Sequence, residues 1–166
     1  MEHATSGLMV KRSGRLPVPG AELYYETEGS GEAVVLVHGF TLDTRMWDDQ
    51  VPELRDVASV VRYDARGFGR SSGPAPAVPY SHSGDQDDPH SPLIPRPFSA
   101  FEDVAVPTTV VVGELDVPCF LTMATVLADR IPGARKITVP GVGHMVNMEA
   151  PHVVNAVLRE AVTTVG

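Results

Sequence analysis

The first half of the chain shows short apolar runs separated by polar turns, a pattern that predicts strands joined by a helix. Residues 21–27 alternate apolar and polar positions before a Gly- and Ser-containing turn, which predicts a half-buried outer strand. Residues 33–37 and 59–63 are rich in β-branched residues, the pattern of strands covered on both faces by helices. Between these strands, one apolar helical face is formed by Trp47, Val51 and Leu54. The three segments predict one βαβ unit.

The second half repeats this arrangement. Residues 108–112 and 135–139 predict two further strands. The helix between them is expected to bury a stripe made of Phe120, Met123, Leu127 and Ile131. A last helix, starting near Pro151, has an apolar face at Val154, Val157, Leu158 and Ala161. We therefore predict an α/β fold with a truncated, mostly parallel sheet flanked by helices.

Length and composition favour a single soluble domain spanning residues 1–166, with a Pro- and Asp-rich linker at about residues 73–103. The formal charge of −8, with no Lys or Arg run longer than two residues, argues against nucleic acid and membrane surfaces as partners. No apolar run approaches the roughly 18 residues of a membrane helix, and the first residues are polar. Together with the single cysteine, these features predict a cytoplasmic protein.

An acid and a histidine follow successive strands of the second half. Asp116 comes just after the strand at residues 108–112, and His144 lies in a Gly-flanked loop after the next strand, 28 residues later. The ends of parallel strands meet at one sheet edge, where ligands and catalytic groups collect. A carboxylate there can orient an imidazole and stabilise its charged form. The alternative for Asp116 is that it caps the helix beginning near Cys119.

His38-Gly39-Phe40 ends the buried strand at residues 33–37. Backbone N–H groups near Phe40 could face a developing oxyanion, although a plain turn before a helix would also use Gly, and His38 could be a packed histidine.

These motifs, with the string Tyr63-Asp64-Ala65-Arg66-Gly67-Phe68-Gly69-Arg70-Ser71-Ser72, occur in an order that resembles α/β-hydrolases of the esterase and enol-lactonase type. The resemblance covers roughly residues 20–75 and 100–163. It implies that Asp116 is the triad acid, that His144 is the general base and that the Phe40 amide contributes to an oxyanion hole. It also implies a small-molecule ester or lactone as substrate, with no cofactor.

The family's nucleophile segment is not found. The family places a strand, a G-x-S-x-G elbow and a helix between the Asp64 and Asp116 strands. Only 43 residues separate Ser72 from Asp116, so the elbow and cap segment is predicted to be deleted. Gly69-Arg70-Ser71-Ser72-Gly73 fits the letters of the motif, but a polar loop precedes it and a Pro-rich stretch follows it. Ser71 and Ser72 are therefore weak candidates for the nucleophile.

Two other groups are given structural interpretations. Cys119 is interpreted as a small buried hydrophobe rather than a nucleophile. The acidic and imidazole side chains of the linker do not have the spacing of a closed metal site, so no metal is expected; they are His82, Asp85, Asp87, Asp88 and His90.

Two hypotheses follow, from different classes. The first is a hydrolase-family protein whose own catalysis is impaired because it lacks a nucleophile, and whose status as an enzyme is therefore open. The second is a non-catalytic binding or interaction module, or the product of a decayed gene. A third, ranked below these, is that another chain supplies the missing strands. Deletion would leave the strands at residues 33–37 and 108–112 either paired directly or with exposed edges that promote self-association.

Overall fold

The computed structural model describes residues 11–73 and 101–165. The chain divides into two compact units. Unit 1 consists of the residues up to Pro76 together with Ala150–Gly166, and unit 2 consists of Ala77–Glu149. Most of the predicted linker, residues 74–100, lies outside the described residues, and the prediction of a single domain stays a prediction.

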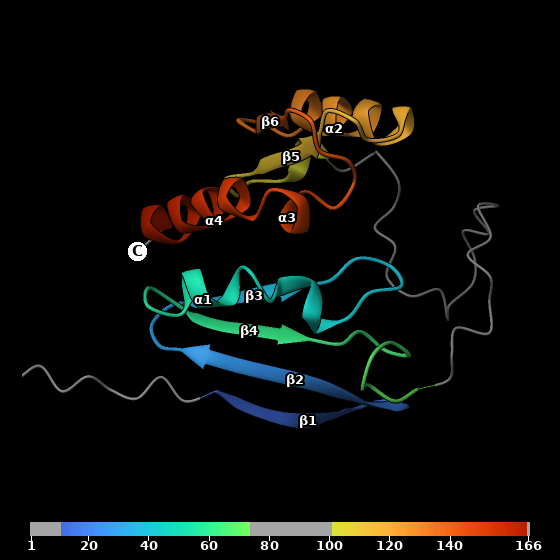
Figure 1. The fold of residues 1–166 in the computed structure, drawn as a ribbon, viewed down its shortest axis with the longest axis vertical. Helices are drawn as coiled ribbons and strands as arrows, with labels where there is room; N and C mark the ends of the chain where they lie inside the picture. The colour runs from blue at the N-terminus through green and yellow to red at the C-terminus, as the bar shows by residue number, and fades with distance from the viewer. Residues whose placement is uncertain (1–10, 74–100, 166) are drawn as a thin grey trace, which may run out of the picture. The chain divides into compact units, whose positions relative to one another are not determined.

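Unit 1 contains a four-stranded sheet of strand order β1-β2-β4-β3 (Figure 1). Its strands are β1 (Arg12–Val18), β2 (Ala21–Gly29), β3 (Ala33–Val37) and β4 (Ser59–Tyr63). β2 is antiparallel to both of its neighbours, and β3 is parallel to β4. The prediction that residues 21–27 form an outer strand is wrong, because β1 pairs along the other edge of β2. The polar sequence of β1 conceals this strand, and Gly20, at φ 76°, closes the hairpin.

The crossover between β3 and β4 forms the predicted βαβ unit. It begins with the 3₁₀ helix η1 (Thr44–Trp47), which Asp43 caps by accepting a hydrogen bond from the Arg45 N–H, and continues with α1 (Val51–Leu54). Both helices are short, because Pro52 in the first turn of α1 cannot donate a hydrogen bond back to η1. The apolar face predicted for this segment is confirmed, since it contributes to the buried cluster of unit 1.

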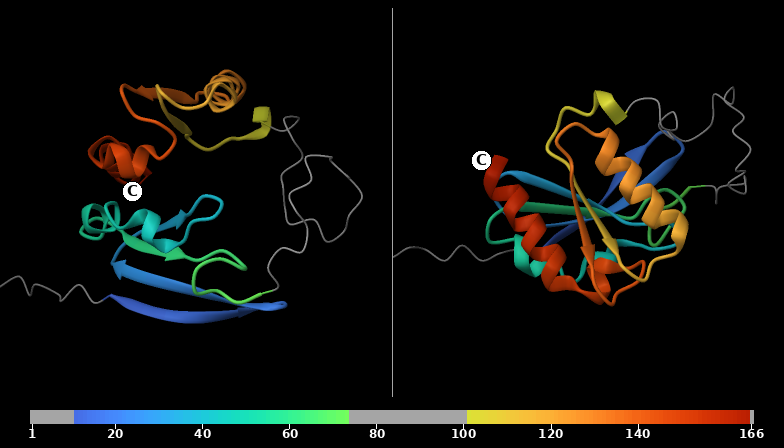
Figure 2. Two further views of the ribbon diagram at one scale, coloured as in Figure 1. Left: turned by 45° about the vertical axis from the view of Figure 1, so that its right-hand side comes forward. Right: turned by 90° about the horizontal axis from the view of Figure 1, so that it is seen from above.

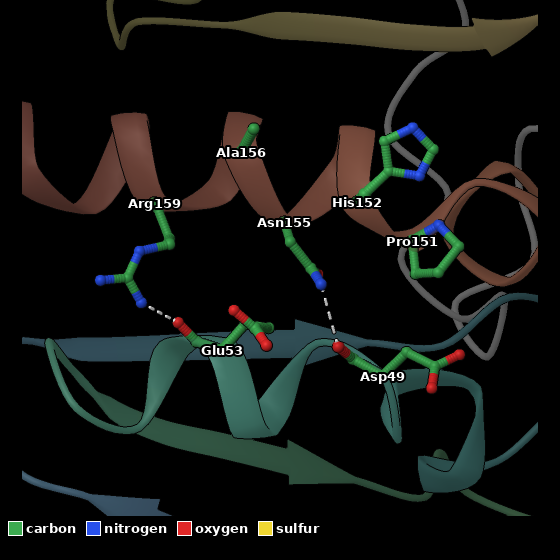
Figure 3. A pocket seen from close by; sticks show the side chains of 7 residues that line it. All are labelled: Asp49, Glu53, Pro151, His152, Asn155, Ala156 and Arg159. Atoms are coloured by element: carbon green, nitrogen blue, oxygen red, sulfur yellow. Dashed lines mark hydrogen bonds between the residues drawn. The ribbon is translucent and has the colours of Figure 1, made fainter.

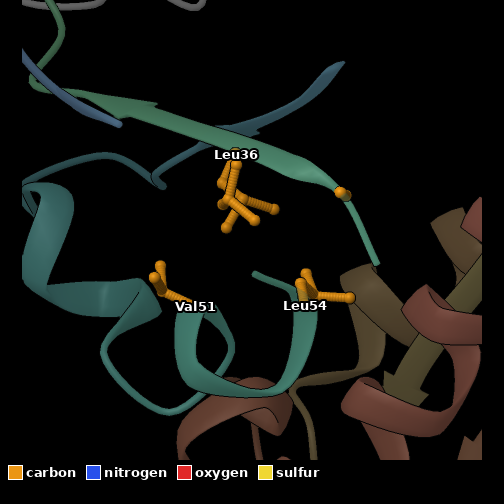
Figure 4. Close-up of a cluster of buried hydrophobic side chains, with 5 residues drawn as sticks. Leu36, Val51 and Leu54 are labelled. Atoms are coloured by element: carbon orange, nitrogen blue, oxygen red, sulfur yellow. The ribbon is translucent and has the colours of Figure 1, made fainter. Parts of the chain in front are cut away.

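The core of unit 1 lies between one face of the β3–β4 pair and the helices (Figure 4). The buried residues are Leu36, Val51, Leu54, Ala58 and Val60, with Val34, Trp47, Leu158 and Val162 packed against them. The last two belong to α4 (Pro151–Val165), the predicted last helix, which lies beside α1 (Figure 2). Leu158 was expected on its apolar face, whereas Ala161 is exposed.

A buried ionic cluster crosses the same sheet face. The Arg62 guanidinium contacts the Glu26 carboxylate at 2.7 Å and the Asp48 carboxylate at 2.6 Å. Burial by itself raises the pKa of Glu26, but hydrogen bonds from Lys11, Tyr24 and Arg62 outweigh this effect and lower the pKa to about 2. Glu26 therefore stays ionised inside the fold because its partners compensate for the lost hydration.

Unit 2 contains a two-stranded parallel sheet, β5 (Thr109–Gly113) with β6 (Arg135–Val139). The 3₁₀ helix η2 (Phe101–Asp103) precedes β5, and α3 (Val146–Glu149) follows β6. The helix η2 thus covers the last three residues of the predicted linker, residues 101–103. The helix α2 (Pro118–Arg130) packs against both strands (Figure 2).

The buried face of α2 differs from the predicted stripe. Ala124 is buried, and so is Ile131, which lies just beyond the end of the helix. Phe120 and Met123 are exposed. Apolar residues occupy both faces of α2, so their spacing alone could not identify the inward face. The prediction was wrong for the first helical turns and correct at Ile131.

The α/β class is confirmed, and the strands form two separate sheets among the described residues. There β3 pairs only with β4, and β5 only with β6. The outward face of β3 is not covered as its sequence predicted, because Val35 and Val37 are 56% and 54% exposed.

Replacing Glu26 by Gln is expected to remove a stabilisation of about 3 kcal/mol at neutral pH. The folded-state pKa lies below the ordinary value of 4.5, so this stabilisation is present above pH 4.5 and lost as the pH falls towards 2. Chemical denaturation at several pH values measures it. Glu22→Gln, at an exposed position of the same strand, is the control. A stability difference between wild type and Glu26→Gln that does not shrink across this range would contradict the assignment.

The open edge and exposed face of β3 are expected to make the chain self-associate. The edge strand β1 contains Pro17 and two Arg residues, which disfavour edge pairing, whereas β3 contains no such residue. Val35→Lys should shift the chain towards monomer in analytical ultracentrifugation. Leu16→Lys, at an exposed apolar position of β1, should leave association unchanged. A wild-type chain that is monomeric at all concentrations would show that β3 does not promote self-association.

Candidate active site

The acid lies directly after β5. The backbone turns there, with the Asp116 N–H donating to the Gly113 carbonyl oxygen, and the Asp116 side chain is 4% exposed. Its Oδ1 accepts a hydrogen bond from the Val117 N–H at 2.7 Å. The alternative role as a helix cap is not supported, because the N-cap of α2 is Val117 and no side chain caps it.

The histidine meets this acid. His144 Nδ1 lies 2.9 Å from Asp116 Oδ2, while the His144 side chain is 57% exposed. A carboxylate can only accept, so Nδ1 carries the proton in this contact and Nε2 keeps its lone pair in the neutral imidazole. The Phe120 ring lies against the imidazole, with the centroids 4.4 Å apart. The two residues are placed as a base and its orienting acid would be, and their catalytic role stays a prediction.

The two loops approach each other closely because β5 ends in glycine. The Glu114 N–H donates to the Val139 carbonyl, and the Leu115 N–H donates to the Val142 carbonyl. A Cβ on Gly113 would overlap the carbonyl oxygens of Val142 and Gly143. Only glycine therefore lets the histidine loop lie against the end of β5.

Two carboxylates that the sequence analysis did not single out fix the histidine loop. Glu114 accepts a hydrogen bond from the Gly141 N–H at 3.0 Å. Glu149 accepts from the Gly143 N–H at 2.8 Å and from the Met145 N–H at 3.0 Å. A Glu one turn into a helix that follows a Gly-rich loop is a capping signal that could have identified Glu149.

His38 serves as a structural histidine in unit 1. Its Nε2 lies 2.8 Å from the Ala65 N–H, which can only donate, so Nδ1 carries the proton and donates to the Gly39 carbonyl at 2.7 Å. The Nε2 contact joins the ends of β3 and β4, and the Nδ1 contact fixes the ring against its own backbone. The Phe40 ring is 63% exposed and contacts Phe68 edge-on. The role predicted for the Phe40 amide stays a prediction.

Comparisons with known proteins identify what this chain resembles in sequence and in fold. The model of the alpha/beta hydrolase fold family matches residues 32–90. The chain is 46% identical to the probable oxidoreductase EphD of Mycobacterium tuberculosis over 66 residues. These residues make up 40% of this chain and 11% of EphD. An esterase from Thermogutta terrifontis superposes with TM-score 0.74 and 19% identity, covering 93% of this chain and 99% of that one. The enol-lactonase from Burkholderia xenovorans gives TM-score 0.71 and 16% identity, with coverages of 90% and 100%.

Residues 32–90 thus resemble the alpha/beta hydrolase fold family, and the solved structures show that the chain has the α/β-hydrolase fold. The matched stretches span between 11% and 30% of the first curated relatives. Among the described residues, no strand, elbow and helix bearing a nucleophile lies between β4 and β5.

The two serines of the G-x-S-x-G match support the loop after β4. Ser71 Oγ donates to the Asp64 carbonyl at 2.6 Å and accepts from the Tyr24 N–H at 2.8 Å. Ser72 Oγ accepts from the Glu22 N–H at 2.8 Å. The proton of Ser71 is therefore directed to a backbone oxygen rather than to a base. Through these hydrogen bonds, Ser71 and Ser72 attach the loop after β4 to β2.

The other candidates contribute no site in the described part of the chain. Cys119 is exposed, so the prediction that it is buried was wrong; it lies in the first turn of α2, which faces outward at that point. The string from His82 to His90 lies outside the described residues. Within residues 11–73 and 101–165, no three His, Cys, Asp or Glu side chains are grouped to hold a metal. No helix in those ranges is long and apolar enough to cross a bilayer.

A hollow of about 490 Å³ lies on unit 1 beside α4 (Figure 3). Its lining residues are Asp49, Glu53, Pro151, His152, Asn155, Ala156 and Arg159. Asn155 donates to the Asp49 carbonyl at 3.1 Å, and the Arg159 guanidinium contacts the Glu53 carbonyl. The hollow accompanies the contacts that attach α4 to the α1 segment, and it contains none of the predicted site residues.

Gly113→Ala is expected to separate Asp116 from His144. The added Cβ meets backbone oxygens that cannot rotate away, so the histidine loop must move. We expect destabilisation of about 2 kcal/mol, typical of overpacking. Thermal unfolding measures this loss, and NMR of the imidazole measures the separation. Gly39→Ala is the control, because its Cβ would meet only Leu42 Cδ1, at 3.7 Å. An unchanged imidazole spectrum in Gly113→Ala would show that the close approach is not required.

Proposed function

We propose that this chain carries the acid and base of an α/β-hydrolase site for carboxylic esters or lactones, and that its turnover is impaired because it lacks a nucleophile elbow. The observation behind the proposal is the 2.9 Å contact between His144 Nδ1 and Asp116 Oδ2 in a half-exposed imidazole. This contact leaves Nε2 as the proton acceptor. Solved structures of the same fold include an esterase and an enol-lactonase, which supports the choice of substrate class.

Without a nucleophile, the pair would act on water. His144 Nε2 takes a proton from water as the water oxygen bonds to the carbonyl carbon, and Asp116 stabilises the resulting imidazolium. The tetrahedral intermediate collapses, the C–O bond to the leaving group breaks, and the imidazolium returns the proton to the departing oxygen. General-base assistance of this kind contributes roughly 10² to 10⁴-fold over the uncatalysed reaction.

Exposed apolar side chains of unit 2 favour an apolar substrate. Leu115, next to the acid, is 67% exposed, and Phe120, which covers one face of the imidazole, is 44% exposed. Apolar surface beside a general base would bind the acyl or alcohol part of an ester.

A non-catalytic binding module is the second candidate. The specific observation in its favour is that the Ser71 and Ser72 hydroxyls are both engaged with backbone groups. A module of this kind would bind an ester or lactone without turning it over. The predicted cytoplasmic location belongs to both versions of the proposal and stays a prediction.

The test is hydrolysis of p-nitrophenyl acetate by the wild-type chain and by His144→Ala. Circular dichroism checks that both are folded. The proposal predicts slow turnover that falls to the background rate in His144→Ala and falls strongly in Asp116→Asn, because the imidazole loses its orienting acceptor. His152→Ala is the matched control, since His152 is an exposed histidine of α4 in unit 1.

Equal rates for folded wild type and His144→Ala would contradict the hydrolase proposal. Binding of the ester without turnover would then favour the module. Activity that appears only when a full-length hydrolase homologue is added would instead favour strands supplied by a second chain.

A further inference from the structure

Glu149 grips the backbone on both sides of His144. Its Oε2 accepts from the Gly143 N–H at 2.8 Å, and its Oε1 accepts from the Met145 N–H at 3.0 Å. The backbone of Glu149 is also held to this loop, because its N–H donates to the Met145 carbonyl at 2.8 Å. The Val142–Gly143 and His144–Met145 peptide groups, one on each side of His144, are therefore held by a single side chain.

The contacts of this loop with Glu114 and with the Leu115 N–H are made at Gly141 and Val142, before Gly143. Gly141 and Gly143 precede the histidine, Gly141 has φ 72°, and glycine leaves the backbone many alternative conformations. The His144 side chain is more than half exposed, and its imidazole Nδ1 contacts Asp116. Small backbone rotations at Gly143 would move Nδ1 away from the carboxylate.

A simple helix cap does not account for both contacts. Capping of α3 requires an acceptor for the Met145 N–H at the start of the helix. The second bond reaches the Gly143 N–H, on the far side of His144 from the helix. The two oxygens of Glu149 thus span the histidine position.

We propose that Glu149 is a positioning residue for His144, which holds the imidazole within hydrogen-bonding distance of Asp116. The inference rests on the proposed function, in which His144 is the base, and it adds a residue that acts through that base. Glutamine cannot replace Glu149, because its side chain offers one acceptor oxygen and would place an NH₂ group against the other backbone N–H.

The experiment observes the imidazole directly, by NMR of the ¹⁵N-labelled full chain. A proton held between His144 Nδ1 and Asp116 gives a low-field signal, and its rate of exchange with water reports how firmly it is held. We expect Glu149→Gln to raise this exchange rate about tenfold or more, because bonds to a charged acceptor are lost. Glu102→Gln, which breaks an exposed ion pair with Arg130 in the same unit, should leave the rate unchanged. Asp116→Asn identifies the signal by abolishing it.

Glu149→Asp provides a second test if the Gln variant does not fold. The shorter Asp side chain keeps the negative charge but can reach only one of the two N–H groups. We therefore expect the imidazole proton to exchange at a rate between those of wild type and Glu149→Gln. The proposal is overturned if either variant exposes the Gly143 and Met145 amides to exchange while the imidazole proton exchanges as in wild type. Glu149 would then only fasten the loop.

The outcome is separable from that of the proposed function. If the wild-type chain shows no ester turnover but the imidazole proton responds to Glu149→Gln, the positioning role stands and the hydrolase proposal fails. If wild type shows no protected imidazole proton, the histidine and the acid do not pair in solution, and the positioning role is overturned.

Discussion

The candidate site depends on the close approach of the loop after β6 to the end of β5. Gly113 makes this approach possible, because a side chain there would occupy the space of two carbonyl oxygens. Backbone hydrogen bonds then join the two strand ends, and the 2.9 Å contact between Asp116 and His144 forms across them. Within unit 2, Asp116 and His144 are thus brought together by two strand ends and the short helix α3. The backbone of this unit fixes the geometry on which the proposed function rests.

In unit 1, the residues that resemble hydrolase motifs stabilise the loop after β4. Asp64 is fully buried and accepts hydrogen bonds from the Thr44 and Arg70 N–H groups, both at 2.7 Å. Gly69, at φ 52°, passes so close to this carboxylate that a Cβ would not fit. With the His38 and Ser71 contacts, these bonds make the string after β4 a self-supporting loop. Much of the sequence that resembles hydrolases therefore maintains backbone geometry rather than chemistry, and its presence says little about turnover.

Features of the fold that depend on local residue patterns could be predicted from the sequence. β-branched runs located β3, β4 and β6, and the order of strand ends brought Asp116 and His144 together. It failed where the deciding contact is distant or where the pattern is ambiguous. The polar strand β1 owes its place to pairing with β2, and α2 has apolar residues on two faces. A capping signal could have drawn attention to Glu149, but its second contact, with the Gly143 N–H, depends on how the loop folds and is not visible in the sequence.

Labelling with a fluorophosphonate, followed by intact mass measurement, tests most directly the claim that the chain holds a base without a nucleophile. Such reagents form a stable adduct with an activated serine, which needs both the hydroxyl and the neighbouring base. The account predicts no adduct on the folded wild-type chain, matching His144→Ala. A stoichiometric adduct that disappears in His144→Ala would contradict it, and peptide mapping of that adduct would identify the nucleophile.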